Sequence, residues 1–376
     1  MNPISNHAIQ TKTKNLNLIR QMTNKKINHF KSHAFFFLFF YTIILLSCKK
    51  ENPTSETIST SSGFFIVNEG NYTWGNSSLS FYNETNQRIE NNIFYKANQV
   101  PLGDVAFDMK IINSKGFITV NNSGLIYVIN PENAKYIATI SSFISPRYIL
   151  PINDSLAYVS DLYSPYISII NTKKYQKTAQ IFIGKSTESM VLWQNKVFAC
   201  NWSFGNKIFV VDIHQHQCID SIQVGLQPNS IQLDKNGNIW VLCDGGYNGN
   251  PIGHEKASLW KINPQTHEAV KKISMPSLDY PANSLSINSN ADSLYFIWKD
   301  IFKVSIYDTV LPSEPFIRAD NANFYSLTIH TKLPRLIVCD AKNYVANGEV
   351  RIYYLNGTLL DSKETGIIPR TICFKP

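Results

Sequence analysis

The order of hydrophobic and polar positions after residue 62 is that of many short strands. The clearest unit contains four runs rich in β-branched and aromatic residues, at 145–150, 156–161, 167–171 and 178–184. Pro, Asn, Asp and Ser are frequent between these runs, and such residues favour turns. The pattern therefore predicts a unit of four strands joined by turns.

The second run of this unit occurs seven times along the chain. Its copies begin at Phe64, Phe117, Leu156, Val197, Ile239, Leu294 and Leu336. Successive copies are about 40 residues apart, with longer steps after the copies at Phe64 and Ile239, where the units carry insertions. Four strands in about 40–45 residues is the period of a propeller blade. The sequence thus predicts an all-β fold consisting of a single seven-bladed β-propeller.

The two ends of the repeat predict how the ring closes. The first unit begins directly with a second-type run, at 64–67, and no first run precedes it. The C-terminal segment 367–374 resembles the first run at 145–150, and no second run follows it. We therefore expect the C-terminal strand to complete the first blade, which removes the open sheet edges.

The first 47 residues differ from the rest of the chain. They contain six basic residues and no acidic residue, and they end in an apolar run of 13 residues at 34–46. A basic segment followed by a short apolar run is typical of a secretory signal, since a membrane-spanning helix needs roughly 20 apolar residues. Met22 is an alternative start within this segment.

The apolar run ends at Leu45-Leu46-Ser47-Cys48, which resembles the lipobox of bacterial lipoproteins. The resemblance implies cleavage before Cys48, lipidation of that cysteine and attachment of the mature chain to a membrane through acyl chains. The next residues are rich in Ser, Thr and charge, which predicts a flexible tether. We therefore expect a signal peptide at 1–47, a lipidated cysteine and tether at 48–62, and the propeller at 63–376.

Charge and cysteine content exclude several classes of partner. Six of the 35 Lys and Arg residues lie in the leader, which leaves 29 against 27 Asp and Glu. No basic patch remains that would favour nucleic acid. Five cysteines follow Cys48 without close spacing, so the sequence predicts neither a disulfide framework nor a metal site. No sequence motif indicates a cofactor.

A ligand site is expected on one face of the propeller. In a four-stranded blade, the loop after the second strand and the connection into the next first strand open on the same face. Both positions are strongly polar in this chain, with aromatic residues close by, which is typical of a small-molecule site. The candidate ligand-binding residues are Asn68, Glu69, Trp74, Asp104, Asn122, Arg147, Asp161, Tyr163, Glu188, Asn201, Trp202, Asn229, Asp244, Tyr247, Asn283, Tyr325, Asp340, Tyr344 and Arg370.

Several longer motifs point to a known family. They include VNEGN at 67–71, DKNGNIWVLC at 234–243 and DAKNYVANGEV at 340–350. With these motifs the chain resembles the YncE-like seven-bladed propeller lipoproteins, and more narrowly their cobalamin-capturing (BtuG-type) branch. The resemblance implies an outer-membrane, surface-exposed lipoprotein that binds cobalamin or a related corrinoid and passes it to a TonB-dependent transporter, without catalysis.

Two other functions stay open at the level of sequence. The same face is compatible with a glycan-binding or protein-binding receptor. Propellers also include enzymes of the lyase and lactonase type, which need a proton-transfer or metal group at the axis. His254 and His330 are the histidines near the later loops, and the sequence gives neither an evident partner.

Overall fold

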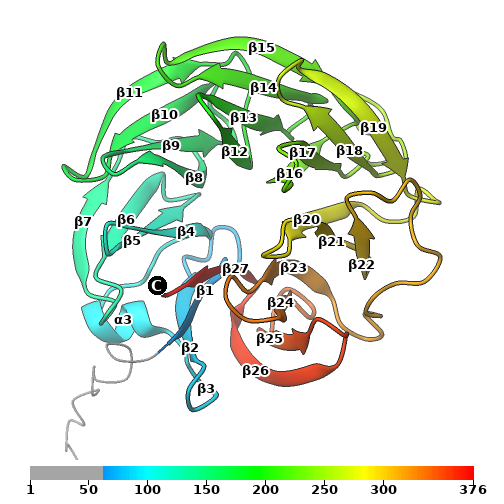
Figure 1. Ribbon diagram of the computed structural model, residues 1–376. Coiled ribbons are helices and arrows are strands. Elements are labelled where there is room, and N and C mark those ends of the chain that lie inside the picture. Colours follow the sequence, from blue (N-terminus) through cyan, green and yellow to red (C-terminus); the bar gives the residue numbers. More distant parts are fainter. Residues whose placement is uncertain (1–61) are drawn as a thin grey trace, which may run out of the picture. The chain divides into compact units, whose positions relative to one another are not determined.

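The computed structural model describes residues 62–376. Seven antiparallel sheets, the blades, form a ring around a central axis (Figure 1), which confirms the predicted seven-bladed β-propeller. The predicted signal peptide, Cys48 and the tether as far as residue 61 lie outside the described residues.

The strands of each blade follow one another from the innermost, at the axis, to the outermost. Blade 1 consists of β27 (Pro369–Phe374), β1 (Gly63–Asn68), β2 (Ser78–Asn83) and β3 (Arg88–Glu90). Blade 2 consists of β4 (Ala106–Ile112), β5 (Lys115–Val120), β6 (Leu125–Ile129) and β7 (Tyr136–Ile140). Blade 3 consists of β8 (Pro146–Asn153), β9 (Leu156–Asp161), β10 (Tyr166–Asn171) and β11 (Gln176–Phe182). Blade 4 consists of β12 (Met190–Trp193), β13 (Lys196–Asn201), β14 (Lys207–Asp212) and β15 (Gln217–Gln223).

The remaining three blades complete the ring. Blade 5 consists of β16 (Pro228–Leu233), β17 (Ile239–Cys243), β18 (Ser258–Asn263) and β19 (Glu268–Ser274). Blade 6 consists of β20 (Ala282–Ile287), β21 (Ser293–Trp298) and β22 (Asp300–Ser305). Blade 7 consists of β23 (Phe324–Ile329), β24 (Arg335–Asp340), β25 (Asn347–Tyr354) and β26 (Leu359–Ile367).

The C-terminal strand closes the ring as predicted. β27 pairs antiparallel with β1, in a register that sets Phe64 opposite Phe374 and Ile66 opposite Ile372. In Figure 1 the red strand β27 lies next to the blue strand β1. Blade 1 is therefore built from both ends of the propeller, and neither end leaves an unpaired inner strand.

Blade 6 departs from the four-stranded unit. Residues 306–323 take the place of its fourth strand, and their backbone pairs with β22 through an isolated bridge between Ile301 and Ile317 instead of a continuous ladder. Pro312 and Pro315 lie in this segment. Proline has no backbone N–H to donate, so the segment cannot continue a regular hydrogen-bond ladder.

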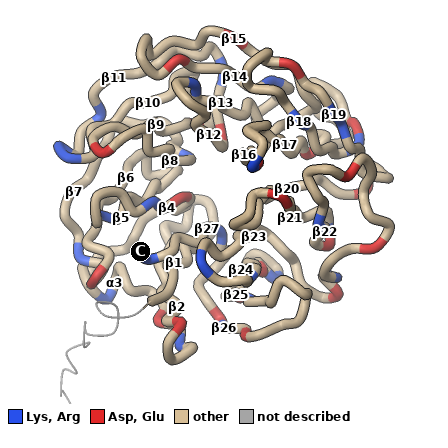
Figure 2. The backbone as a smooth tube through the Cα atoms, viewed as in Figure 1, with Lys and Arg blue, Asp and Glu red and all other residues tan. Residues whose placement is uncertain are grey.

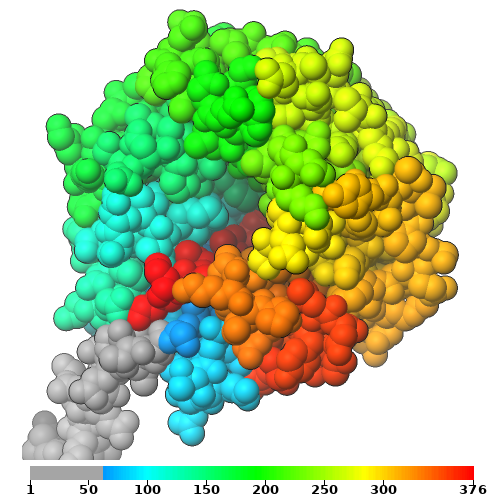
Figure 3. Space-filling model, in the orientation of Figure 1, coloured from blue at the N-terminus to red at the C-terminus, as the bar shows by residue number. Residues whose placement is uncertain are grey.

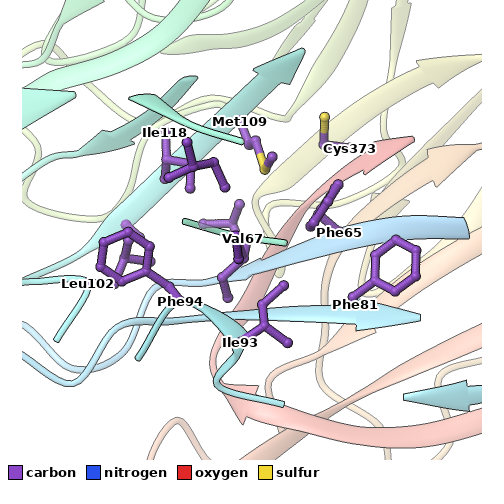
Figure 4. Packing of buried hydrophobic residues seen from close by; sticks show 13 residues of the cluster. Phe65, Val67, Phe81, Ile93, Phe94, Leu102, Met109, Ile118 and Cys373 are labelled. Atoms are coloured by element: carbon purple, nitrogen blue, oxygen red, sulfur yellow. The ribbon is translucent and has the colours of Figure 1, made fainter. Parts of the chain in front are cut away.

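The hydrophobic core lies within and between the blades. The second strands are its most buried elements, and every residue of β1 and β17 is buried. Figure 4 shows the cluster between blades 1 and 2, in which Phe65 and Val67 pack near Met109 and Ile118. A short helix, α3 (Ile93–Asn98), adds Ile93 and Phe94 to this cluster, and the strand pattern did not predict it.

The innermost strands surround a hollow at the centre of the ring, which the space-filling view in Figure 3 shows. Basic and acidic residues are interspersed over the propeller (Figure 2), with no large region of one sign. Mixed charge of this kind agrees with the nearly balanced composition of the chain after its leader.

Candidate functional site

Backbone hydrogen bonds bring together the two sets of polar positions, those after the second strands and those before the first strands, at one end of the central hollow. The N–H of Glu69, which follows β1, donates to the carbonyl of Ile368 before β27 at 2.8 Å. The N–H of Asp244, which follows β17, donates to the carbonyl of Gln227 before β16 at 3.1 Å. This repeated contact places the ends of the second strands beside the starts of the first strands. We call this end of the hollow the mouth.

A cavity of about 620 Å³ occupies the hollow below the mouth, and we call it the axial cavity. Its walls come mainly from the innermost strands of all seven blades. The predicted ligand-binding residues that line it are Arg147, Glu188, Trp202, Asn229, Asp244, Asn283, Tyr325 and Arg370.

Two arginines hold a phenylalanine between them beside this cavity. The guanidinium carbon of Arg147 lies 3.4 Å from the centre of the Phe107 ring, and that of Arg370 lies 3.7 Å from it. Blade 2 supplies Phe107, and the arginines come from its two neighbours, blades 3 and 1. Two guanidinium groups this close to one ring centre must lie on opposite faces of it, an arrangement that attraction between cation and ring stabilises.

Each arginine also pairs with a buried carboxylate. Arg147 Nε donates to Glu188 at 2.8 Å, and Arg370 Nη1 donates to Glu69 at 2.8 Å. The Tyr325 hydroxyl donates to the other oxygen of Glu69 at 3.0 Å. Burial raises the pKa of the Tyr325 hydroxyl, and the neighbouring Glu69 carboxylate raises it further. The tyrosine therefore remains protonated and acts as a donor at neutral pH.

The pair of Arg147 and Glu188 is neutral overall but retains free donors. Burial raises the pKa of Glu188, and the attraction of Arg147 and Arg370 opposes that rise. Within the described chain, the terminal nitrogens of Arg147 donate to no protein acceptor, although Arg147 lines the cavity. A neutral pair with free N–H groups suits a neutral acceptor such as an amide carbonyl.

A second cavity, of about 540 Å³, opens beside the axial cavity at the loops of blades 3 to 6, and we call it the rim groove. Tyr163, Phe204 and Tyr247 line it, and the exposed fractions of these residues are 70%, 54% and 51%. Trp202, Asp244 and Pro281 line both cavities and so join them into one site.

Asp244 is the carboxylate at this junction. Its two oxygens accept hydrogen bonds from Trp202 Nε1 at 2.6 Å and from the N–H of Gly246 at 2.7 Å. Burial raises its pKa to about 6, although both hydrogen bonds act to lower it. No Lys or Arg among the described residues forms a salt bridge with Asp244, so its charge is not balanced by a cation.

Four other predicted residues form hydrogen bonds with neighbouring loops or, for Asn68, with β2. The carboxylate of Asp161 accepts four backbone N–H groups, from residues 144, 145, 163 and 164. Asp340 binds the N–H groups of residues 323 and 342 and pairs with Arg351. Asn68 donates to Ser78 and Ser80, and Asn201 donates to the carbonyl of Ser186. These four side chains organise the mouth and are themselves buried.

Four further predicted residues, Trp74, Asp104, Asn122 and Tyr344, lie around the mouth and line neither cavity. Asp104 accepts hydrogen bonds from the Thr73 N–H and from Asn122. Trp74 is 74% exposed, and Tyr344 contacts the Tyr325 ring edge-on, with ring centres 5.9 Å apart. Asp104, Asn122, Trp74 and Tyr344 therefore surround the site instead of forming its walls.

Sequence reasoning missed several residues in the walls and directly behind them. Phe107, Tyr148 and Lys110 lie on innermost strands, and Phe204 lies in the loop after β13. Tyr148 accepts a hydrogen bond from Arg370 Nη2 at 3.2 Å. A search limited to the residues at strand ends cannot find Tyr148 or Lys110, which lie further along their strands. The available signal was that alternate side chains of an innermost strand point toward the axis.

Neither histidine of the later loops provides an evident catalytic pair at the axis. His254 lines the rim groove. His330 follows the far end of β23 and contacts Glu84 at 3.1 Å, so it does have a partner, away from the mouth. Residues 62–376 contain no group of three or more His, Cys, Asp or Glu placed to hold a metal ion. No helix within that range is long and apolar enough to span a bilayer.

These features define the class as a closed seven-bladed propeller with a polar, aromatic-walled site at one end of its axis. The chain belongs to the family described as "Domain of unknown function (DUF5074)", whose model matches residues 62–355. No curated protein matches the chain.

Solved structures with the same fold include three of diverse origin. A quinonprotein alcohol dehydrogenase-like protein from Bacteroides thetaiotaomicron has a TM-score of 0.64 and 15% identity, covering 84% of this chain and 78% of its own. Hydrazine synthase of Kuenenia stuttgartiensis has a TM-score of 0.57 and 12% identity, and the match covers 71% of this chain and 89% of that one. The Cps50 (Swd1) β-propeller domain of Myceliophteria thermophila has a TM-score of 0.57 and 8% identity, and the match covers 75% of this chain and 94% of that one. Identities this low show the fold alone.

Proposed function

We propose that this protein is a lipid-anchored outer-membrane surface protein that binds a nutrient, cobalamin or a related corrinoid, and delivers it to a TonB-dependent transporter. The observation that carries the binding role is the joined pair of cavities at the mouth, about 620 and 540 Å³. Polar donors and acceptors line the first, and aromatic side chains line the second. A large amphipathic ligand needs both kinds of wall.

The chemistry of a corrinoid suits this arrangement. Such a ligand carries many amide groups around a wide macrocycle. The free N–H groups of Arg147 and the amide of Asn229 can bond amide groups of the ligand, while Trp202 and Tyr247 can cover its apolar surface. The proposed role is binding and transfer, and it assigns no catalytic residue.

The lipid anchor rests on the N-terminal sequence, and the surface location rests on the resemblance to the YncE-like lipoproteins and on the charged residues that follow Cys48. Cys48 follows a short apolar run, and acyl chains on that cysteine replace a spanning helix as the membrane attachment. Labelling with a radioactive fatty acid tests this part, and Cys48→Ser is the matched variant. Label on the wild-type chain and none on the variant is expected; equal label on both would refute the anchor.

Calorimetric titration with cyanocobalamin tests the ligand. We expect one-to-one binding with nanomolar or tighter affinity, which Arg147→Ala and Trp202→Ala weaken at least about tenfold because each removes a wall of the site. Lys332→Ala, a change at the opposite end of the hollow, is the matched control and leaves the affinity unchanged. No heat with cyanocobalamin, together with binding to oligosaccharides in a glycan screen, would replace the corrinoid with a glycan ligand.

A further inference from the structure

The walls of the rim groove combine aromatic rings with acidic side chains, which gives an apolar lining with a negative electrostatic potential. Its lining contains the rings of Tyr163, Trp202, Phe204 and Tyr247. The charged or titratable groups in that lining, apart from tyrosine, are Asp244, Asp279 and His254, and no Lys or Arg is among them. The faces of aromatic rings carry partial negative charge and attract cations, most strongly where water is excluded.

The carboxylate of Asp244 lacks the balancing cation that Glu188 and Glu69 have. Glu188 lies 2.8 Å from Arg147, and Glu69 lies 2.8 Å from Arg370. Asp244 has two neutral donors, the Trp202 indole and the Gly246 backbone, and both cavities reach it. A partly buried carboxylate without a counter-charge attracts a positive group from the ligand.

We propose that the rim groove binds a cationic group of the ammonium type, with Asp244 as its counter-ion and Trp202 and Tyr247 as its aromatic walls. The indole N–H bond to Asp244 fixes the carboxylate beside the ring, so both attractions act at one place. The Tyr163 and Phe204 rings also line the groove and are more than half exposed, so they can close over a bound methylated ammonium. The cation site shares Trp202 and Tyr247 with the aromatic wall proposed for the corrinoid, but Arg147 does not line the rim groove. The inference rests on Asp244 and these rings and not on the identity of the ligand in the axial cavity.

The test compares choline with 3,3-dimethylbutan-1-ol, a neutral molecule of the same shape. Binding of each to the purified chain in a non-ionic detergent is measured by saturation-transfer NMR and by quenching of tryptophan fluorescence. We expect choline to bind about tenfold more tightly than the neutral analogue, since their difference is the positive charge. Equal binding of the two molecules, or no choline binding, would overturn the proposal.

Variants locate the site. Asp244→Asn keeps the size of the side chain and is expected to weaken choline binding about tenfold while leaving the neutral analogue unchanged. Because Asn supplies one acceptor oxygen to the two donors that Asp244 serves, Tyr247→Leu provides a second test at an exposed position and should also weaken choline binding. Lys332→Ala is the control at the opposite opening. Full choline binding by both Asp244→Asn and Tyr247→Leu would refute the assignment.

A parallel titration of the same sample with cyanocobalamin separates this inference from the proposed nutrient. Choline binding without corrinoid binding supports the cation site and overturns the proposed ligand. Corrinoid binding without choline binding supports that ligand and overturns the cation site.

Discussion

Asp244 makes the stability of the folded chain depend on pH in an unusual direction. Burial raises its pKa from the ordinary value of 3.8 to about 6, against the hydrogen bonds from Trp202 and Gly246. Between these two values the folded chain still holds the Asp244 proton, whereas the unfolded chain has released it. The contribution of the protonated carboxyl is therefore complete below pH 3.8 and is lost as the pH rises through about 6.

The size of the effect follows from the difference between the two pKa values. The rise from 3.8 to about 6 corresponds to about 3 kcal/mol, at 1.36 kcal/mol for each pKa unit. Asp244→Asn lacks the titrating group. We therefore expect the free energy of unfolding of the wild type, relative to that of the variant, to fall by about 3 kcal/mol between about pH 3 and pH 7.

Urea unfolding at a series of pH values, followed by tryptophan fluorescence, measures this difference. Subtracting the variant from the wild type cancels the other carboxylates, because both chains share them. Trp202→Phe is a second useful variant. The indole hydrogen bond lowers the pKa of Asp244, so without it the loss of stability should occur at a higher pH than in the wild type. A difference that stays constant across the pH series would show that Asp244 is not held in a desolvated place and would refute the reasoning.

Three further changes probe the loops and the closure of the ring. Tyr325→Phe removes the hydroxyl that bonds Glu69 and should lower the free energy of unfolding by about 1–2 kcal/mol in urea titrations; an unchanged midpoint would contradict it. Asp161→Ala leaves four backbone N–H groups without their acceptor and should cost about 2–3 kcal/mol in the same assay, where a neutral effect would show that water replaces the carboxylate. Deletion of residues 367–376 removes β27 and should abolish the cooperative thermal transition seen by circular dichroism, while deletion of Pro376 alone should preserve it; equal melting curves would contradict the closure.

The repeat made most of the fold predictable. The alternation of short apolar runs and turns identifies each second strand, and the surplus segment at 367–374 predicts the partner of β1. What the pattern could not give is the loss of the fourth strand in blade 6, because the proline-containing segment 306–323 is of the length that a strand and its turns would need. The helix α3 was also missed, since six residues are too few for a periodic signal.

The sequence predicted where on the propeller the candidate site lies, but it predicted only some of the side chains that line it. The sequence pattern groups Asp161 with Asp244 because both lie at the end of a second-type run, yet the structure gives them different surroundings. Asp161 meets four backbone N–H groups of its own loops, whereas Asp244 meets two donors and opens onto both cavities. The number of hydrogen-bond donors around each carboxylate depends on the conformation of the neighbouring loops. The spacing of residues in a single sequence does not show that conformation.

The closure of blade 1 has a mechanical consequence for a chain held at its N-terminal side. A pull transmitted through residue 62 acts on β1 along its length, between two neighbours that both pair with it. Six residue pairs join β1 to β2 and five join it to β27, so the strand cannot slide without breaking both ladders together. The load therefore acts in shear on a fully buried strand and cannot peel an outer strand one bond at a time. An attachment at this end places force on one of the most firmly held strands of the propeller.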